Sequence, residues 1–191
     1  MIKLSGPWED GYAFDMHTLY SIHTGYNEYG HPTFDTKRSP MGEYIYGLKY
    51  GQHIDILENI VYLLTHDRSF SRFIKNVDII FPVPSSNKYR RIQPVLVCSQ
   101  KLSIIYKKEL REDVLKSTNK EELKNIPNTE KYDRIKDAII VDDYIDKTKK
   151  ILLFDDVYDS GATLSAMANA LKEKGFKRIF VFTLTKTRKA D

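Results

Sequence analysis

The chain has 191 residues, of which 41% are hydrophobic and 29% are charged. This composition is that of a globular protein with one domain and an appendage, and it excludes a disordered, collagen-like or coiled-coil chain. The formal net charge of +4 is too small to name a partner, although a mild basic excess suits an anionic ligand.

Residues 1–40 carry no helical periodicity and are rich in Gly, Tyr, His and Asp. Short alternating pieces such as Tyr12 and Phe14 predict hairpin strands. We therefore expect residues 1–50 to form a small β-rich hood and residues 51–191 to form the α/β core. One cluster in the hood either closes over a planar ligand or packs a hairpin onto the main sheet. It consists of Trp8, Tyr12, Asp15 and His17.

Two helices and a strand are predicted next. Residues 41–49 and 54–66 are expected to be helical, and the apolar side chains of the second segment recur at i, i+3, i+4 and i+7. These side chains are Leu57, Ile60, Val61 and Leu64. The apolar run Asp78–Val83 ends in prolines, which predicts a buried strand that leads into the loop PSSNKYRR at residues 84–91.

A further helix is predicted to begin at Pro94, because proline is favoured in a first helical turn. Its apolar face is expected to hold Val95, Cys98, Leu102 and Ile105. Cys98 is the only cysteine, so no internal disulfide and no cysteine-based zinc site can form, and we interpret it as a buried core thiol. Residues 107–136 are polar and weakly patterned, which predicts a mobile loop with one or two edge strands.

The remaining segments alternate between strands and a helix. Ala138–Asp142, Ile151–Asp156 and Arg178–Thr185 are apolar runs that predict strands. Residues 161–174 predict a helix whose buried stripe holds Leu164, Met167, Ala168 and Leu171. A helix between two strands is the crossover of a parallel sheet. The fold class expected is therefore α/β, with a parallel β-sheet flanked by helices.

The segment ILLFDDVYDSGATL combines a strand, two acids, a Ser-Gly turn and a helix start, and this combination predicts an anion-binding site. The backbone N–H groups of residues 159–163 lack intrahelical partners and lie at the positive end of the helix dipole. Gly161 allows close approach of the backbone, and Ser160 and Thr163 add hydroxyl groups. One phosphate group fits such a turn.

Asp155 and Asp156, beside a phosphate site, would repel the ligand unless they face hydroxyl groups of that ligand or a divalent cation. A phosphorylated sugar with Mg²⁺ meets both conditions. The alternative is that the two acids only end a strand and that Ser160 only caps a helix. The order of strand, paired acids, Ser-Gly-x-Thr and helix favours the binding site.

The segment LLFDDVYDSGATL, at Leu152–Leu164, resembles the phosphoribosyl pyrophosphate (PRPP) signature of type I phosphoribosyltransferases. With LKYGQ at Leu48–Gln52 and FPVPSS at Phe81–Ser86, it makes the chain most similar to the ComF-like group, which is related to amidophosphoribosyltransferases. The resemblance covers the chain from about Gly42 to Lys186. It implies the type I phosphoribosyltransferase fold with a small N-terminal hood.

The resemblance implies roles for the residues of this signature. Asp155 and Asp156 would hold the ribose 2′ and 3′ hydroxyl groups of PRPP and would meet Mg²⁺ only indirectly, through PRPP. The 5-phosphate would be bound by Asp159, Ser160, Gly161, Ala162 and Thr163.

The loop FPVPSSNKYRR lies where the family places its pyrophosphate loop. It offers hydroxyl groups and positive charge, both of which suit a diphosphate. These come from Ser85, Ser86, Lys88, Arg90 and Arg91, and Lys88 and Arg90 would act catalytically by stabilising the departing pyrophosphate. Taken alone, the same loop is equally a solvated basic turn.

Asp159 has two interpretations. In 6-oxopurine salvage enzymes an acid in the same DxxDxG spacing assists the purine ring nitrogen, so Asp159 is a candidate catalytic residue that points to a nucleobase acceptor. The alternative is that Asp159 caps the helix N-terminus, a position in which Asp is favoured.

The activity implied is transfer of the phosphoribosyl group from Mg-PRPP to a nitrogen acceptor with release of pyrophosphate. The alternative is a non-catalytic ComF-like protein that binds PRPP or nucleic acid, through basic stretches such as residues 88–91 and 147–150, in DNA uptake or regulation. The acceptor and a homodimeric state are left open. No apolar run is long enough for a membrane span, so we expect a cytoplasmic protein.

Overall fold

The computed structural model describes residues 1–51, 53–85, 89–114 and 145–188. The predicted strand Ala138–Asp142 and most of the predicted loop at 107–136 lie outside these residues. The elements follow in the order β1 (Ile2–Lys3), β2 (Asp10–Met16), β3 (Thr18–Tyr26), β4 (Pro32–Arg38), α1 (Pro40–Tyr46), η1 (Gly47–Gly51, a π-helical turn), α2 (Ile56–His66), α3 (Arg68–Lys75), β5 (Ile79–Pro82), α4 (Pro94–Tyr106), β6 (Glu109–Leu110), β7 (Lys150–Tyr158), α7 (Ala162–Glu173) and β8 (Arg178–Lys186).

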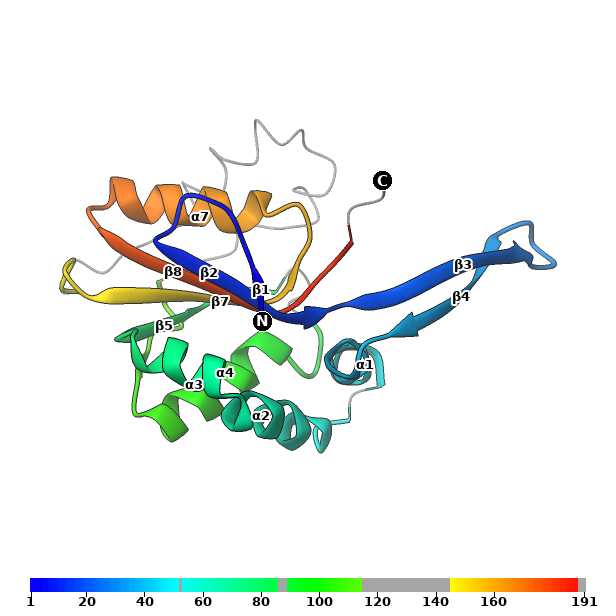
Figure 1. The fold of residues 1–191 in the computed structure, drawn as a ribbon, viewed down its shortest axis with the longest axis horizontal. Coiled ribbons are helices and arrows are strands. Elements are labelled where there is room, and N and C mark those ends of the chain that lie inside the picture. Colours follow the sequence, from blue (N-terminus) through cyan, green and yellow to red (C-terminus); the bar gives the residue numbers. More distant parts are fainter. Residues whose placement is uncertain (52, 86–88, 115–144, 189–191) are drawn as a thin grey trace.

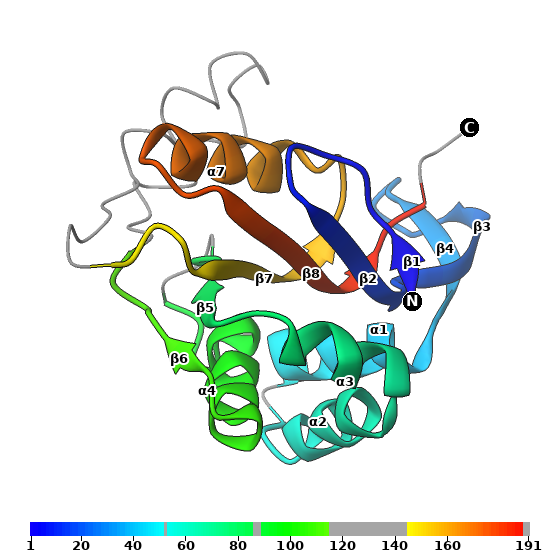
Figure 2. The same cartoon turned by 60° about the vertical axis from the view of Figure 1, so that its left-hand side comes forward.

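The main sheet has the strand order β1-β2-β8-β7-β5-β6. Its strands run parallel from β2 to β6, and β1 pairs with β2 in the antiparallel sense. Helix α7 covers one face of the sheet, and α1, α2, α3 and α4 cover the other (Figures 1 and 2). The chain is therefore an α/β protein with a mostly parallel sheet flanked by helices.

The central strands are buried on both faces, because helices lie above and below them. In β7, Leu153 packs in the apolar cluster on the α7 side, whereas Leu152 and Phe154 pack in the cluster on the side of α1 to α4. Strand β8 alternates in the same way, with Val181 on the first side and Phe182 on the second. Because alternate side chains enter one or the other of two buried faces, both strands are continuous apolar runs in the sequence.

Several predicted boundaries shift in the structure. Strand β7 continues to Tyr158, two residues beyond the predicted end at Asp156. Helix α3 was not predicted, and Ile105 of α4 is 48% exposed although its predicted face is otherwise buried. The predicted helix at residues 41–49 ends as the π-helical turn η1.

The segment predicted as a β-rich hood contributes to two sheets. Strands β1 and β2 belong to the main sheet, and β2 pairs in parallel with β8 rather than only in a hairpin. Strands β3 and β4 form a separate hairpin that projects from the body of the molecule (Figure 1). The hairpin carries exposed apolar side chains, among them Ile22 at 58% and Phe34 at 55%.

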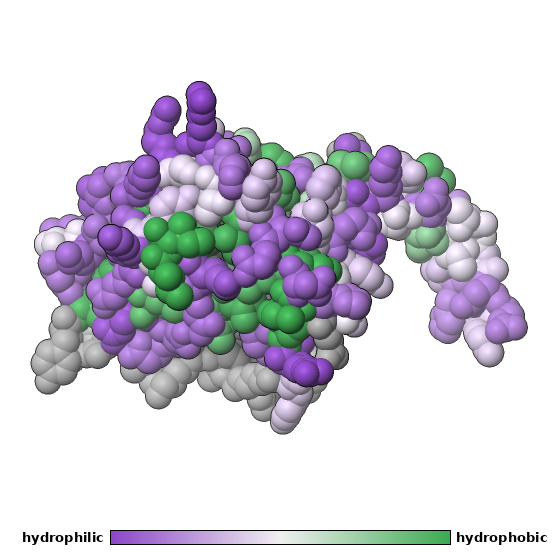
Figure 3. Space-filling view, turned by 90° about the horizontal axis from the view of Figure 1, so that it is seen from below, coloured by the Kyte–Doolittle hydropathy of each residue, from purple (hydrophilic) through white to green (hydrophobic). Residues whose placement is uncertain are grey.

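The outer surface of the helical layer is mainly hydrophilic, with scattered hydrophobic groups (Figure 3). Cys98 lies inside this layer at 0% exposure, and burial raises the pKa of its thiol. Its interpretation as a core thiol agrees with this burial. Among the helices that the structure describes, none has the length and apolar character needed to cross a membrane.

Candidate functional site

The candidate site lies at the carboxyl ends of the parallel strands, between β5 and β7. From β5 the chain passes through α4 to β6 at one edge of the sheet, and from β7 it passes through α7 to β8 in the other direction. Helices α4 and α7 lie on opposite faces (Figure 2). Ligands of open α/β sheets bind where the strand order reverses in this way. The predicted carboxylates and both predicted phosphate loops adjoin this position.

Asp155 and Asp156 lie within β7, and both are half-buried. Successive side chains of a strand point to opposite faces, so Asp155 points to the α7 side and Asp156 to the side of α1 to α4. The Asp156 N–H donates to Asp155 Oδ1 at 2.8 Å. The two carboxylates therefore face different neighbours, although they are adjacent in the sequence.

Asp156 forms an ion pair with Lys49 of η1. The distance between Lys49 Nζ and Asp156 Oδ2 is 2.7 Å, and the two side chains are only 16% and 17% exposed. The Thr185 hydroxyl donates to the Asp156 backbone carbonyl at 3.2 Å, so a side chain of β8 also contacts Asp156. Sequence reasoning gave Lys49 no role, although the quoted LKYGQ motif contains it.

Residues 159–163 form a turn that leads into α7. Gly161 is the N-cap residue and has a φ of +77°, a left-handed conformation that favours glycine. The Ser160 hydroxyl accepts a hydrogen bond from the Ala162 N–H at 3.3 Å. The other N–H groups of the first turn have no carbonyl of their own helix to bond, and Thr163 lies half-buried beside them. Such a turn can bind one phosphate group.

Asp159 is exposed and accepts a hydrogen bond at Oδ1 from the Thr187 hydroxyl, at 2.7 Å. The interpretation of Asp159 as a helix cap is wrong, because Gly161 is the N-cap residue and the Asp159 carboxylate bonds to Thr187 instead. Thr187 follows β8 directly, and its N–H donates to the Tyr158 carbonyl. The chain after β8 therefore holds Asp159 at the edge of the site.

The loop after β5 begins beside the carboxylates, because the Val83 N–H donates to the Phe154 carbonyl at 2.8 Å. Ser85 and Arg90 of this loop are half-buried, and Arg91 is exposed. Ser86 and Lys88, two further predicted ligands, lie outside the described residues.

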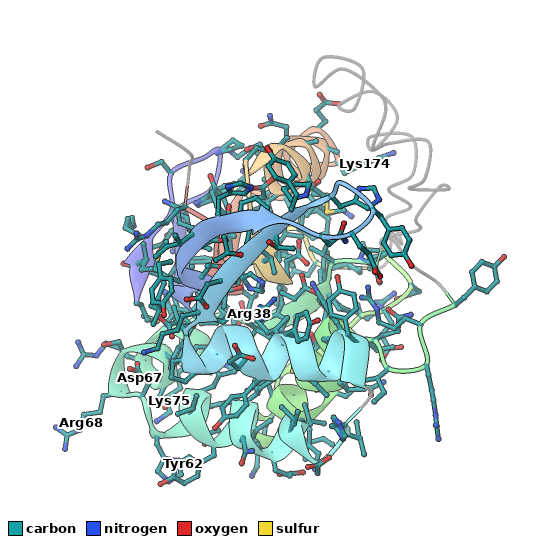
Figure 4. The ribbon with its side chains drawn as sticks, turned by 90° about the vertical axis from the view of Figure 1, so that its right-hand side faces the viewer. Arg38, Tyr62, Asp67, Arg68, Lys75 and Lys174 are labelled. Carbon is teal, nitrogen blue, oxygen red and sulfur yellow. The ribbon has the colours of Figure 1, made fainter. Side chains whose placement is uncertain are left out.

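A row of two neighbouring tyrosine rings with an arginine at each end lies beside this loop. The Arg38 guanidinium is 3.9 Å from the ring centre of Tyr46, the rings of Tyr46 and Tyr50 are 4.8 Å apart, and the Arg90 guanidinium is 5.9 Å from the ring centre of Tyr50. Arg38 lies between the base of the hairpin and α1 (Figure 4). The row thus links the hairpin, α1, η1 and the loop after β5. Three of its four residues had no predicted role.

The predicted cluster of the hood does not come together. Trp8 packs edge-on against Tyr158, with ring centres 6.5 Å apart, whereas Tyr12 packs edge-on against Phe73 in the other apolar cluster. Asp15 accepts a hydrogen bond from the next N–H of its own strand. Trp8 precedes β2, and Tyr12 and Asp15 lie on alternate faces of that strand, so these side chains separate, and of the four only His17 approaches the site.

His17 is half-buried at the base of the hairpin, and its Nδ1 lies 3.0 Å from the Thr185 hydroxyl oxygen. Burial lowers the pKa of His17, and the positive charges of Lys49 and Arg38 lower it further. The ring is therefore neutral at neutral pH. Since the Thr185 hydroxyl donates to the Asp156 carbonyl, its oxygen accepts the Nδ1 proton and leaves Nε2 as an acceptor.

This pKa shift predicts a pH dependence of stability. The unfolded chain takes up a proton at His17 as the pH falls through about 6.5, while the folded protein still holds the neutral form, so stability is lost as the pH falls. We expect the melting temperature of the wild type to fall more steeply between about pH 7 and pH 5 than that of His17→Gln. His31→Gln, in the exposed hairpin turn, is the control and should follow the wild type. Equal slopes for wild type and His17→Gln would contradict the assignment.

Mg²⁺ fits this site only together with an anionic ligand. Among the described residues, no group of three or more His, Cys, Asp or Glu side chains is arranged to hold a metal ion. Asp155 and Asp156 supply carboxylate oxygens, and Mg²⁺ is commonly held by one or two carboxylates together with substrate phosphates. The donor set therefore suits a cation that arrives with its ligand.

The basic stretch at residues 147–150 lies at the amino end of β7, away from this edge. Lys147 Nζ lies 4.4 Å from the ring centre of Phe176, and Lys150 Nζ donates to Asn76 Oδ1 at 2.7 Å. Both lysines make contacts within the protein, and the prediction that this stretch binds nucleic acid stays a prediction.

A scan against models of protein families finds no family that matches this chain, and a search of curated proteins finds no matching relative. The class of protein defined by the fold is α/β with a mostly parallel sheet. The function is inferred from the residues of the site.

Proposed function

We propose that this chain is a phosphoribosyltransferase of the type I fold that uses PRPP with Mg²⁺ and releases pyrophosphate. One observation carries the proposal. The paired carboxylates of β7 lead through a left-handed Gly161 into the N-terminus of α7, at the strand edge where the loop after β5 begins. A carboxylate pair suits ribose hydroxyl groups, and a helix N-terminus suits a phosphate.

The ligand would span the edge from α7 to the loop after β5. Its 5-phosphate would accept hydrogen bonds from the turn at residues 159–163. Its ribose would lie at the edge of β7 beyond Phe154, where the pairing with β5 ends, and its hydroxyl groups would donate to Asp155 on one face and Asp156 on the other. The diphosphate at C1 would lie toward Arg90, whose guanidinium is held over Tyr50. Positive charge there stabilises the leaving group, and bound Mg²⁺ would neutralise further charge on the diphosphate.

In the reaction a nitrogen atom of the acceptor attacks C1, and the bond from C1 to the diphosphate oxygen breaks with its electron pair. The protein contributes orientation and electrostatic stabilisation. Asp159 lies at the edge with one carboxylate oxygen bonded to Thr187. If the acceptor is a nucleobase, Asp159 is the residue placed to take the proton that its nitrogen loses.

The first test measures the melting temperature of the wild type with PRPP and Mg²⁺. A ligand at about a hundredfold excess over its Kd adds about 2.7 kcal/mol to the stability of the folded state, so we expect a shift of several degrees. Ribose alone with Mg²⁺ is the control and should give no shift. The absence of a shift with PRPP would contradict the proposal.

A second measurement separates catalysis from binding. Pyrophosphate release is followed while nucleobases and other nitrogen compounds are offered with PRPP and Mg²⁺. Release that depends on one acceptor identifies the substrate. A protein that is stabilised by PRPP but releases no pyrophosphate with any acceptor would fit a non-catalytic PRPP-binding protein instead.

A further inference from the structure

The ion pair between Lys49 and Asp156 differs from the surface ion pairs of this protein. Its two side chains are 16% and 17% exposed, whereas those of Lys101 and Glu58 are 45% and 67% exposed. Exposed pairs contribute little to stability because water screens them. The partly buried pair of Lys49 with a carboxylate of the candidate site is therefore less screened by water than the exposed pair of Lys101 and Glu58.

Lys49 occupies hydrogen-bonding capacity that a sugar would need. An ionised carboxylate offers about four lone-pair positions, and the ammonium group takes one of them on Asp156 Oδ2. It approaches from η1, on the side of α1 to α4, which is the side that Asp156 faces. A ribose hydroxyl group that bonds to Asp156 from that side competes directly with Lys49.

The same turn contacts the loop that follows β5. The Arg90 guanidinium lies 5.9 Å from the ring centre of Tyr50, the residue after Lys49. The turn η1 therefore contacts a carboxylate of β7 through Lys49 and a basic residue of the loop through Tyr50. A π-helical turn within a run of helix often marks a functional position, and here η1 interrupts the chain between α1 and α2.

We propose that Lys49 is a binding residue for the diphosphate group of PRPP, which it reaches by leaving Asp156. This inference rests on the proposed function above. In the free protein the ammonium group is neutralised by Asp156. When the ligand enters, its hydroxyl group takes the place on Asp156 and the diphosphate binds the ammonium group, so Lys49 stays paired with an anion and the Asp156 carboxylate stays hydrogen-bonded. The flexible four-carbon stem of lysine allows this exchange.

The exchange has opposite consequences for the two parts of the ligand. Without Lys49, the ribose hydroxyl groups meet no competitor at Asp156, but the diphosphate loses a cation. A lysine that only orients Asp156 would instead affect all ligands with these hydroxyl groups equally. PRPP and ribose 5-phosphate share the ribose and the 5-phosphate and differ in the diphosphate, so their affinities separate the two roles.

The test measures both affinities by titration calorimetry, with Mg²⁺ present, for the wild type, Lys49→Met and Lys101→Met. We expect the preference for PRPP over ribose 5-phosphate to fall about tenfold or more in Lys49→Met, the scale of one charge-assisted hydrogen bond. The affinity for ribose 5-phosphate should stay equal or increase. Lys101→Met removes the same charge from an exposed ion pair and should leave the preference unchanged.

The outcomes separate this inference from the proposed function. If the wild type does not bind PRPP, the proposed function is wrong, and the role of Lys49 is wrong with it. If it binds PRPP and the preference is the same in Lys49→Met as in Lys101→Met, the role of Lys49 is wrong and the proposed function stands. If Lys49→Met does not fold, Lys49→Gln, which retains a donor for Asp156, must show the same fall in preference, and a wild-type preference in that variant overturns the inference.

Discussion

Replacing Asp155 and Asp156 together by asparagine is expected to lower the affinity for PRPP by at least about a hundredfold, because two charge-assisted hydrogen bonds to the ribose are weakened. The wild type should be stabilised by PRPP with Mg²⁺, and the double variant should show no shift of its melting temperature. The measurement is a thermal melt of both proteins with and without the ligand.

The double variant also changes the folded protein, because an asparagine in place of Asp156 cannot form the ion pair with Lys49. Losing one partner of a partly buried pair costs about 1–2 kcal/mol, less than for a fully buried one, since an amide oxygen can still accept from Lys49. Urea denaturation without ligand measures this cost separately from binding. The matched control is Glu28→Gln with Asp35→Asn, which makes the same charge change on the exposed hairpin.

The single variants test the geometry of the two carboxylates. Asp155→Asn should weaken PRPP binding, and its side-chain amide oxygen can still accept the hydrogen bond from the Asp156 N–H. Asp156→Asn should weaken binding and also lower the free energy of unfolding, because Lys49 loses its partner. Wild-type affinity for PRPP in the double variant would contradict the assignment of the ribose site.

The second large effect is expected for Gly161→Ala. An alanine at a φ of +77° costs about 1–2 kcal/mol in backbone strain. Its Cβ would also clash with the Tyr158 side chain, because the Tyr158 hydroxyl oxygen lies closer than van der Waals contact allows. The ring or the turn must therefore shift, at a further cost of about 1–3 kcal/mol. A shifted turn no longer presents its N–H groups together, and affinity for PRPP should fall about tenfold or more.

Gly30→Ala is the matched control for this substitution. Gly30 has a φ of +75° in the hairpin turn, and nothing lies within 4 Å of the position of its Cβ. The two variants share the backbone strain, so the difference between their urea denaturation curves measures the cost of displacing Tyr158. Equal losses of stability with unchanged PRPP binding in Gly161→Ala would show that the turn does not depend on this contact.

Local pattern was sufficient for the segment from β7 to α7. The apolar run, the paired acids, the glycine and the amphipathic helix are adjacent in the chain, and each is determined by short-range steric and hydrogen-bonding preferences. The helix stripe predicted from Leu164, Met167 and Leu171 is buried in the structure. The end of the strand was wrong by two residues, because pairing with β8 extends β7 to Tyr158.

Tertiary contacts decided what surrounds those residues. Trp8 and Tyr12 are close in the sequence but pack in different apolar clusters, because Trp8 precedes β2 and packs on the α7 side, whereas Tyr12 lies within β2 and packs against Phe73 of α3. A pattern of aromatic residues cannot tell a hairpin strand from a strand of the main sheet, since both have a period of two. The predicted cluster therefore separated into two unrelated packing sites.

The sequence by itself determined that this is an α/β protein and that a glycine turn into a helix follows two carboxylates, because these features depend on neighbours a few residues apart. The structure alone showed that Lys49 pairs with Asp156, that Thr187 holds Asp159 and that Tyr50 contacts Arg90. These pairs join residues far apart in the chain. Their contact depends on how the helices pack on the sheet, which is set by the burial of whole apolar faces and leaves no local signal in the sequence.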